Sequence, residues 1–134
     1  SKKEFVFNFD QDSNPKKITK SIELVYGLRN FIGNANKFAK NTIFINLKSD
    51  SEITEITVED DGDGYPRDII SKIGEPYLKS NYSKDKSKEG LGLGLFIGKT
   101  LLEKNFASVN CRNSKTRNGA EVVIRWKNKE LFNI

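Results

Sequence analysis

The feature that most constrains the fold of this sequence is a stretch of helical periodicity from about Thr19 to Lys40. Apolar residues recur in it at helical intervals: Ile22, Val25, Leu28, Ile32, Ala35, Phe38 and Ala39. This spacing places them on one face of an amphipathic helix, and such a face is stable when it packs against another layer. The stretch therefore predicts a layered domain in which this helix covers a sheet or a second helix.

Five other segments have the composition or the alternation of β-strands: Phe5–Phe9, Ile43–Lys48, Ile53–Glu59, Ala107–Arg112 and Glu121–Lys127. The second and third are expected to form a hairpin through Ser49–Glu52. The last two are expected to turn through Arg117–Asn118–Gly119.

A second strong helix is predicted at about Leu93–Lys104, and a short one at Pro66–Ile73, opened by its proline. Asp10–Lys17 and Gly74–Glu89 are polar and are expected to be loops, the longer one mobile. The elements together predict an α+β fold over residues 1–134. We expect a single domain, a two-layer α/β sandwich whose mixed, mostly antiparallel sheet is covered by about three helices.

The composition excludes several kinds of site. The chain has no histidine, so it contains no histidine-based triad, imidazole zinc ligand or imidazole acid–base catalyst. Cys111 is the only cysteine, which excludes an internal disulfide and a CxxC metal site. Cys111 is expected to be a small core or strand residue. No apolar run is long enough to span a bilayer and no signal-peptide pattern is present. We expect a cytoplasmic domain, whose parent protein can still be anchored in the inner or plasma membrane.

The net charge of +5 and the pI of about 9.3 favour an anionic partner. The lysines are spread along the chain, without a zinc-finger spacing, an aromatic RNA-binding signature or an arginine-rich arm. The phosphates of a nucleotide explain the charge as well as a polymer does, so no nucleic acid is expected. A solvated lysine-rich loop remains an alternative for much of it.

Three polar residues, Asn30, Asn34 and Lys37, share one stripe of the first long helix. Amide oxygens can coordinate a hard cation, and a lysine one turn further along can meet phosphate. On this helix alone, an ordinary solvent-facing stripe is the better interpretation.

The run Asp60-Asp61-Gly62-Asp63-Gly64 directly follows a predicted strand. A carboxylate there can accept a hydrogen bond from an exocyclic amine such as that of adenine, and the glycines let the backbone approach a flat ligand. No glutamate closes the loop as in an EF-hand. A tight Asp-Gly turn remains the alternative.

Alternating glycines in Gly90-Leu91-Gly92-Leu93-Gly94 lead straight into the second long helix. Backbone amides at a helix N-terminus are suited to phosphate. The spacing is neither GxGxxG nor that of a P-loop, so a Rossmann site and a Walker site are both disfavoured.

The order of these motifs resembles the GHKL superfamily of ATP-binding domains. Asn30–Phe38 resembles its N box, Asp61–Gly64 its G1 box and Gly90–Gly94 its G2 box. Asn118-Gly119-Ala120 is similar to its final glycine motif, with alanine where threonine is usual. The match covers nearly the whole chain and implies a fold of the Bergerat type.

The resemblance implies ATP and Mg²⁺ as cofactors. Asn34 would coordinate the metal, with Asn30 beside it and Lys37 on phosphate. The adenine would contact four residues: Phe38, Asp61, which would bond its amine, Gly62 and Gly64. The remaining contacts would come from a lid at about residues 74–89 and its hinge: Lys88, Gly90, Leu91, Gly92, Leu93 and Gly94.

Asn30 indicates the branch of the superfamily. Hydrolytic members similar to gyrase, Hsp90 and MutL have a glutamate there, which activates water, whereas histidine kinases have asparagine. Gly74–Tyr77 and Gly94–Ile97 resemble redox-responsive sensor kinases of the Reg/Prr type.

The resemblance implies a histidine protein kinase domain that donates the γ-phosphoryl group of ATP in two-component signalling. Since the chain lacks histidine, the acceptor is expected on the dimerisation domain of the same parent protein, with a response regulator downstream. The alternatives are an anti-sigma-type serine kinase, and a nucleotide- or nucleic-acid-binding regulatory module without transfer activity.

Overall fold

The computed structural model describes residues 3–9, 22–70 and 91–131. The strands are β1 (Glu4–Phe9), β2 (Thr42–Ser49), β3 (Ile53–Asp60), β4 (Ser108–Asn113) and β5 (Ala120–Lys127). The helices are α1 (Ile22–Phe38), α2 (Arg67–Ile70), α3 (Leu91–Lys104) and α4 (Asn128–Leu131).

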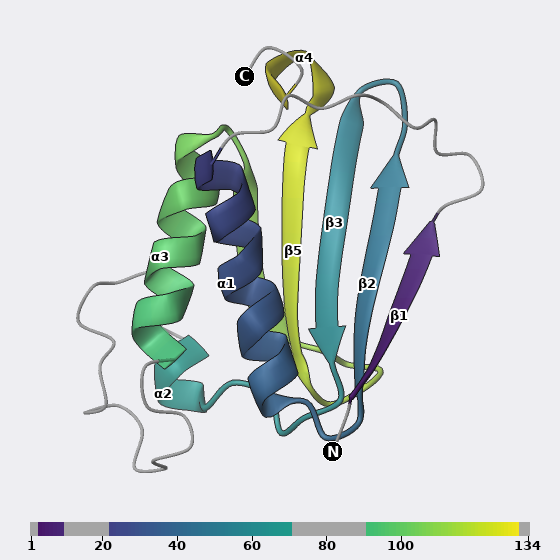
Figure 1. Ribbon diagram of the computed structural model, residues 1–134, viewed down its shortest axis with the longest axis vertical. Helices are drawn as coiled ribbons and strands as arrows, with labels where there is room; N and C mark the ends of the chain where they lie inside the picture. The colour runs from purple at the N-terminus through teal and green to yellow at the C-terminus, as the bar shows by residue number, and fades with distance from the viewer. Residues whose placement is uncertain (1–2, 10–21, 71–90, 132–134) are drawn as a thin grey trace.

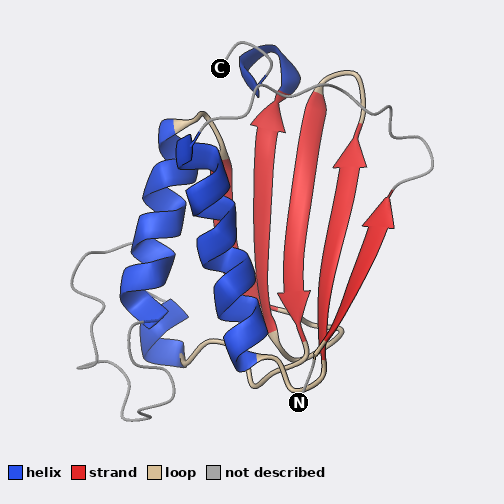
Figure 2. Cartoon of the chain, viewed as in Figure 1, coloured by secondary structure: helices blue, strands red, loops and turns tan. Residues whose placement is uncertain are grey.

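The strands form one mixed sheet in the order β1-β2-β3-β5-β4. β1 pairs with β2 in parallel, and α1 is the crossover between them, whereas the other three pairs are antiparallel. Figures 1 and 2 show α1 and α3 side by side over one face of this sheet. The predicted α+β fold class, with a mixed and mostly antiparallel sheet, is confirmed.

The five predicted strands, the hairpin at Ser49–Glu52 and both long helices are present. α4 was not predicted, and β3 extends one residue beyond the predicted end, to Asp60. The loops at Asp10–Lys17 and Gly74–Glu89 and the end of the predicted helix at 71–73 lie outside the described residues. Within the described ranges, no helix is both long and apolar enough to cross a bilayer.

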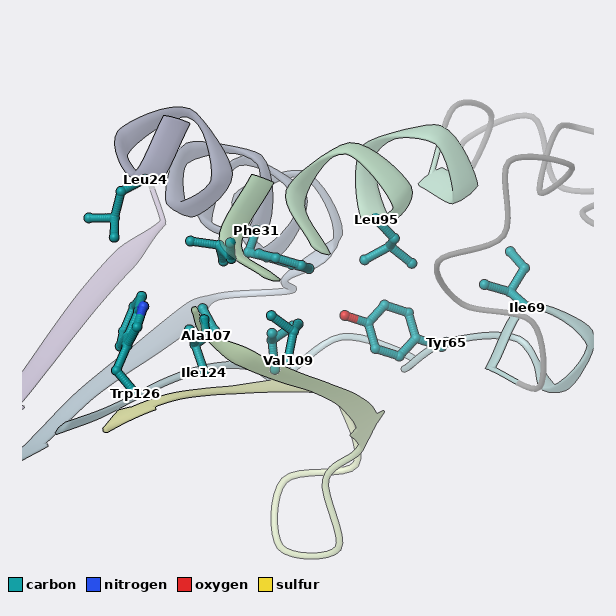
Figure 3. Packing of buried hydrophobic residues seen from close by; sticks show 11 residues of the cluster. Leu24, Phe31, Tyr65, Ile69, Leu95, Ala107, Val109, Ile124 and Trp126 are labelled. Carbon is teal, nitrogen blue, oxygen red and sulfur yellow. The ribbon is translucent and has the colours of Figure 1, made fainter. Parts of the chain in front are cut away.

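The main core lies between the helices and the sheet. In Figure 3, Phe31 and Leu95 lie on the helix side of the core, and Ile124 and Trp126 of β5 lie on the sheet side. All four are almost fully buried. The indole N–H of Trp126 donates to the carbonyl oxygen of Asn105 at 3.2 Å, so its polar atom is satisfied inside the core. Burial of these large side chains contributes to the hydrophobic stabilisation of the two layers.

α1 and α3 approach each other closely because glycines lie at their contact. A Cβ on Gly98 would lie 2.8 Å from the Phe31 ring, and one on Gly27 would lie 2.7 Å from the Leu102 side chain. Neither distance is compatible with the present packing. The two glycines therefore set how closely the helices pack, and further along the same contact Gly94 lies against Asn34.

Gly98→Ala is expected to lower the free energy of unfolding by about 1–3 kcal/mol, because the added methyl group overpacks the contact with Phe31. Gly33→Ala is the matched control on α1: no atom lies within 4 Å of the added Cβ. Alanine there is expected to stabilise the chain by about 0.5–1 kcal/mol. Urea denaturation of the two variants checks this, and a stabilising effect of Gly98→Ala would contradict the role given to the helix contact.

Candidate functional site

A pocket lies under the C-terminal half of α1, at the end of the sheet where β3 terminates. Its walls come from four segments of the chain: Phe31, Asn34, Ala35 and Phe38 of α1, Val58 and Asp60 of β3, Gly64 and Tyr65 after β3, and Ala120 of β5. The pocket therefore joins segments that are far apart in the sequence.

Asp60 provides the buried charge of this pocket. It is 3% exposed, and its Oδ1 accepts hydrogen bonds from the amides of Gly62 (2.8 Å) and Ala120 (3.3 Å). Burial raises the pKa of Asp60 above its usual value; the two amides oppose this shift, and the charges of Asp61 and Glu59 add to it. Both bonds end on Oδ1, so Oδ2 can accept a hydrogen bond from a ligand.

Asp61 lies outside the pocket, contrary to the expectation that it meets an adenine amine. Its carboxylate accepts hydrogen bonds from the amides of Lys40, Asn41 and Thr42 at 2.9–3.3 Å, where α1 ends and β2 begins. Partial burial raises the pKa of Asp61, but these amides outweigh it, and the net pKa is lower than usual. The assignment of Asp61 to the base is therefore wrong, because its carboxylate holds a chain connection.

Asn34 is the polar residue that α1 contributes to the pocket. Its Nδ2 is buried and has no hydrogen-bond partner among the described residues. A buried amide without a partner is unfavourable by about 1–3 kcal/mol, and such a group in a native fold calls for an explanation. A polar ligand explains it, and rotation of the amide would present Oδ1, an oxygen of the type that Mg²⁺ accepts.

The other expected residues of α1 divide into those at the pocket and those away from it. Phe38 lines the pocket. Asn30 does not, because its Nδ2 donates to the carbonyl oxygen of Tyr26 on its own helix at 2.8 Å. Lys37 is exposed, with Nζ 5.3 Å from the centre of the Phe38 ring. Asn34 is thus the one member of the polar stripe that faces the pocket.

The glycines of the G1-like loop lie where the backbone comes close to other groups and leaves no room for a side chain. Gly64 has a φ of +82° and lines the pocket. Gly62 does not line it, but a side chain at Gly62 would overlap the carbonyl oxygen of Phe38. The loop can therefore pass beneath the end of α1 because position 62 has no side chain.

The G2-like residues are only partly described. Gly94 lies next to Asn34, with a Cβ position 3.2 Å from Nδ2, whereas Leu93 is 51% exposed. Leu91 and Gly92 form the first turn of α3. Gly90, Lys88 and the expected lid at 74–89 lie outside the part of the chain that the structure describes.

Tyr65 and Asp60 were not singled out from the sequence as site residues. Strand alternation could have revealed Asp60, because it continues the inward side of Ile56 and Val58. Tyr65 contacts Cys111 by a side-chain hydrogen bond, and burial raises the pKa of the Cys111 thiol to about 12. Cys111 is half-buried and packs against the core, so its expected role as a small strand residue is confirmed.

Comparisons with known proteins agree with this fold. The family model described as histidine kinase-, DNA gyrase B-, and HSP90-like ATPase matches residues 19–130. The sensor histidine kinase RegB of Cereibacter sphaeroides is 38% identical over 108 residues, covering 77% of this chain and 23% of RegB.

Two solved structures share the fold. The mycobacterial sensor histidine kinase MprB has a TM-score of 0.72 at 21% identity, over 92% of this chain and 82% of that chain. Full-length ShkA in complex with AMPPNP has a TM-score of 0.67 at 22% identity, over 91% of this chain and 25% of that chain.

The chain belongs to the family of histidine kinase-, DNA gyrase B- and HSP90-like ATPases, as the order of its motifs predicted. It is similar to the sensor histidine kinase RegB, which confirms the resemblance to kinases of the Reg/Prr type. It spans about a quarter of the length of that relative.

Asp61→Ala is expected to lower the free energy of unfolding at pH 7 by about 1–2 kcal/mol, because the amides of residues 40–42 lose their acceptor. Since the pKa of Asp61 is lowered by folding, its contribution is present above the ordinary value of 3.8 and is lost as the pH falls through the lower folded value. The difference in the free energy of unfolding between the unmodified chain and Asp61→Ala should therefore shrink at the acid end of a pH series.

Asp63→Ala is the matched control for this series. Asp63 is two residues further on, and its ion pair with Lys40 (3.3 Å) joins two side chains that are 63% and 75% exposed. Such surface pairs contribute little, so no measurable loss is expected. Equal losses for Asp61→Ala and Asp63→Ala would contradict the role given to Asp61.

Proposed function

We propose that this chain binds Mg²⁺-ATP in the pocket beneath α1 and donates the γ-phosphoryl group to a histidine on a separate dimerisation and phosphoacceptor domain. The observation that carries the proposal is the presence in one pocket of the buried carboxylate of Asp60 and the unpartnered amide of Asn34. One group suits an adenine amine, and the other suits the metal-bound phosphates.

The base end of the pocket is formed by Asp60, Gly64 and Phe38. Oδ2 of Asp60 accepts the hydrogen bond from the exocyclic amine of adenine, in place of the contact expected from Asp61. Phe38 offers an aromatic surface to the base, and Gly64 has no side chain to obstruct it. Guanine has a carbonyl at the position of that amine and would face the carboxylate unfavourably.

The phosphate end lies toward Asn34 and the start of α3. The contact of Gly94 with Asn34 brings the N-terminal turn of α3 to the same end of the pocket, where its amides and helix dipole favour phosphate. Asn34 would hold Mg²⁺ through its amide oxygen, and the bound ion would neutralise phosphate charge. Lys37, three residues further along α1, would meet the phosphates from the exposed rim.

Transfer rather than hydrolysis is supported by the residues near Asn34. Asn30 is a neutral amide without useful proton affinity, and it is bonded to its own helix, so it cannot activate water. The chain thus contributes positioning and charge neutralisation to in-line attack by an external group. RegB is named a sensor histidine kinase and ShkA is solved with AMPPNP. The name of RegB supports a histidine acceptor on the parent protein, with a response regulator downstream, and the AMPPNP complex of ShkA supports a nucleotide site.

Asp60→Asn is expected to weaken Mg²⁺-ATP binding by about 1.5–3 kcal/mol, because the adenine amine loses a charge-assisted hydrogen bond. Asp61→Asn is the matched control, because it makes the same change at the next residue, which lies outside the pocket. It should leave the affinity for Mg²⁺-ATP within about twofold of that of the unmodified chain. Titration calorimetry measures both. A larger loss in Asp61→Asn, or equal affinity of the unmodified chain for GTP and ATP, would sink the assignment of Asp60.

The chain alone is expected to hydrolyse ATP very slowly. When the dimerisation domain of its parent is added as a separate protein with radiolabelled ATP, that domain should acquire an acid-labile, alkali-stable label. Asn34→Ala should abolish the labelling, whereas Asn36→Ala, an exposed asparagine on the same helix, should not.

Two results would count against the histidine acceptor. One is turnover by the chain alone at about 1 s⁻¹ or faster, which is typical of an enzyme that hydrolyses its substrate. The other is an acid-stable label, which would indicate a serine acceptor and a kinase of the anti-sigma type.

A further inference from the structure

A buried polar cluster lies on the face of the sheet opposite to α1 and α3. Because side chains alternate along β3, Glu59 points away from the pocket that Asp60 lines. Glu59 is nevertheless only 5% exposed, and Ser114 is 7% exposed. We call Glu59, Ser114 and Arg117 the outer-face cluster.

The outer-face cluster attaches the turn between β4 and β5, residues 114–119, to β3. The hydroxyl of Ser114 donates to Glu59 Oε2, and Arg117 Nε lies 3.4 Å from Oε1. The Arg117 guanidinium also lies 3.6 Å from the centre of the Phe44 ring on β2. Within the turn, Ser114 Oγ accepts from the amides of Thr116 (3.3 Å) and Arg117 (3.2 Å).

The charges around Glu59 explain why two arginines are needed. Glu121 of β5 lies directly opposite Glu59 in the register, and two facing carboxylates would repel each other. Glu121 pairs with Arg112, and Glu59 pairs with Arg117. Each carboxylate therefore has its own cation, and that of Glu59 comes from the turn.

The same turn forms one wall of the pocket. The amide of Ser114 donates to the carbonyl oxygen of Gly119 at 2.7 Å, which closes the turn. Any side chain on Gly119 would overlap the carbonyl oxygen of Asp60. The next residue, Ala120, lines the pocket and donates its amide to Asp60 Oδ1. Together with the amide of Gly62, the position of the turn thus fixes which oxygen of Asp60 remains for a ligand.

The opposite wall is attached to the beginning of the turn. Asn113, at the end of β4, accepts from the amide of Tyr65 at 2.7 Å and donates to its carbonyl oxygen at 3.2 Å. A shift of the turn would therefore move both Ala120 and Tyr65.

We infer that the outer-face cluster is a positioning device for the base end of the nucleotide site. Glu59 holds the turn in register with β3 from the far side of the sheet, so that the Ala120 amide occupies Oδ1 of Asp60 and Oδ2 faces the base. This inference rests on the adenine contact proposed for Asp60. The residues of the outer-face cluster act through Asp60 and do not touch the nucleotide.

The chain offers matched variants for a test. Arg117→Ala removes the cation of Glu59. Arg125→Ala removes the cation of Glu55, four residues earlier on the same face of β3, in an ion pair of 2.6 Å away from the turn. Their side chains are similarly exposed, at 41% and 54%. Glu59→Gln and Glu55→Gln form a second pair that keeps side-chain volume.

The first measurement is the affinity of the 134-residue chain for Mg²⁺-ATP and for purine riboside triphosphate, which lacks the exocyclic amine. Arg117→Ala and Glu59→Gln are expected to reduce the preference for ATP by about three- to tenfold. Arg125→Ala and Glu55→Gln should keep the preference of the unmodified chain. Equal losses of affinity for both nucleotides would show a merely structural role and overturn the inference.

The second measurement needs no nucleotide. Amide hydrogen exchange at Gly62 and Ala120, the two donors to Asp60, should accelerate by about tenfold in Arg117→Ala and Glu59→Gln and not in the control pair. If the unmodified chain shows no preference for ATP, the adenine contact of Asp60 fails, and the exchange rates alone decide whether the cluster positions Asp60. Unchanged exchange in folded variants would overturn the inference whatever the nucleotide result.

Discussion

The carboxylate of Asp60 ends a central strand inside the fold, and a buried charge of this kind is tolerated only when hydrogen bonds replace its water. The donors come from two distant segments, Gly62 after β3 and Ala120 at the start of β5. Both segments have to come close to Asp60 to donate these hydrogen bonds. Each contains a glycine at which a side chain would overlap backbone atoms: one on Gly62 would overlap Phe38, and one on Gly119 would overlap Asp60 itself. The pocket is the space that remains when these groups converge on one carboxylate.

The sequence was sufficient for the fold and for predicting that Asn34, Phe38 and Gly64 lie at one pocket, but not for the orientation of single side chains. The periodicities predicted both long helices and all five strands, because each buries an apolar face. Asp61 was assigned to the base because the resemblance was aligned at Asp61–Gly64. The predicted strand ended at Glu59, so the alternation that directs Asp60 inward and Asp61 outward was not available to correct that alignment. The amides that hold Asp61 lie about 20 residues earlier in the chain, and no local pattern reveals such a contact.

The polar stripe of α1 shows the same limit. Spacing placed Asn30, Asn34 and Lys37 on one side of a helix. This stripe extends beyond the pocket, which only Asn34 of the three lines. Which member enters the pocket depends on how α3 packs, and Gly27 and Gly98 set that packing through their contacts with Leu102 and Phe31. Gly92 and Gly94 of α3 were interpreted from the sequence as part of a phosphate motif, whereas the packing of Gly98 against Phe31 required the structure.

The pairing of β3 with β5 has a consequence for how this domain folds. Asp60 and Ala120 meet across 60 residues of chain, whereas the hairpin of β2 and β3 closes over a short turn. Local contacts form more readily than distant ones, because closing a long loop is opposed by chain entropy. A folding intermediate that contains only α1 and the β2–β3 hairpin would have Asn34, Phe38 and Asp60 but lack the wall that β5 supplies. A ligand of the completed pocket would then bind only chains in which the last distant strand has docked.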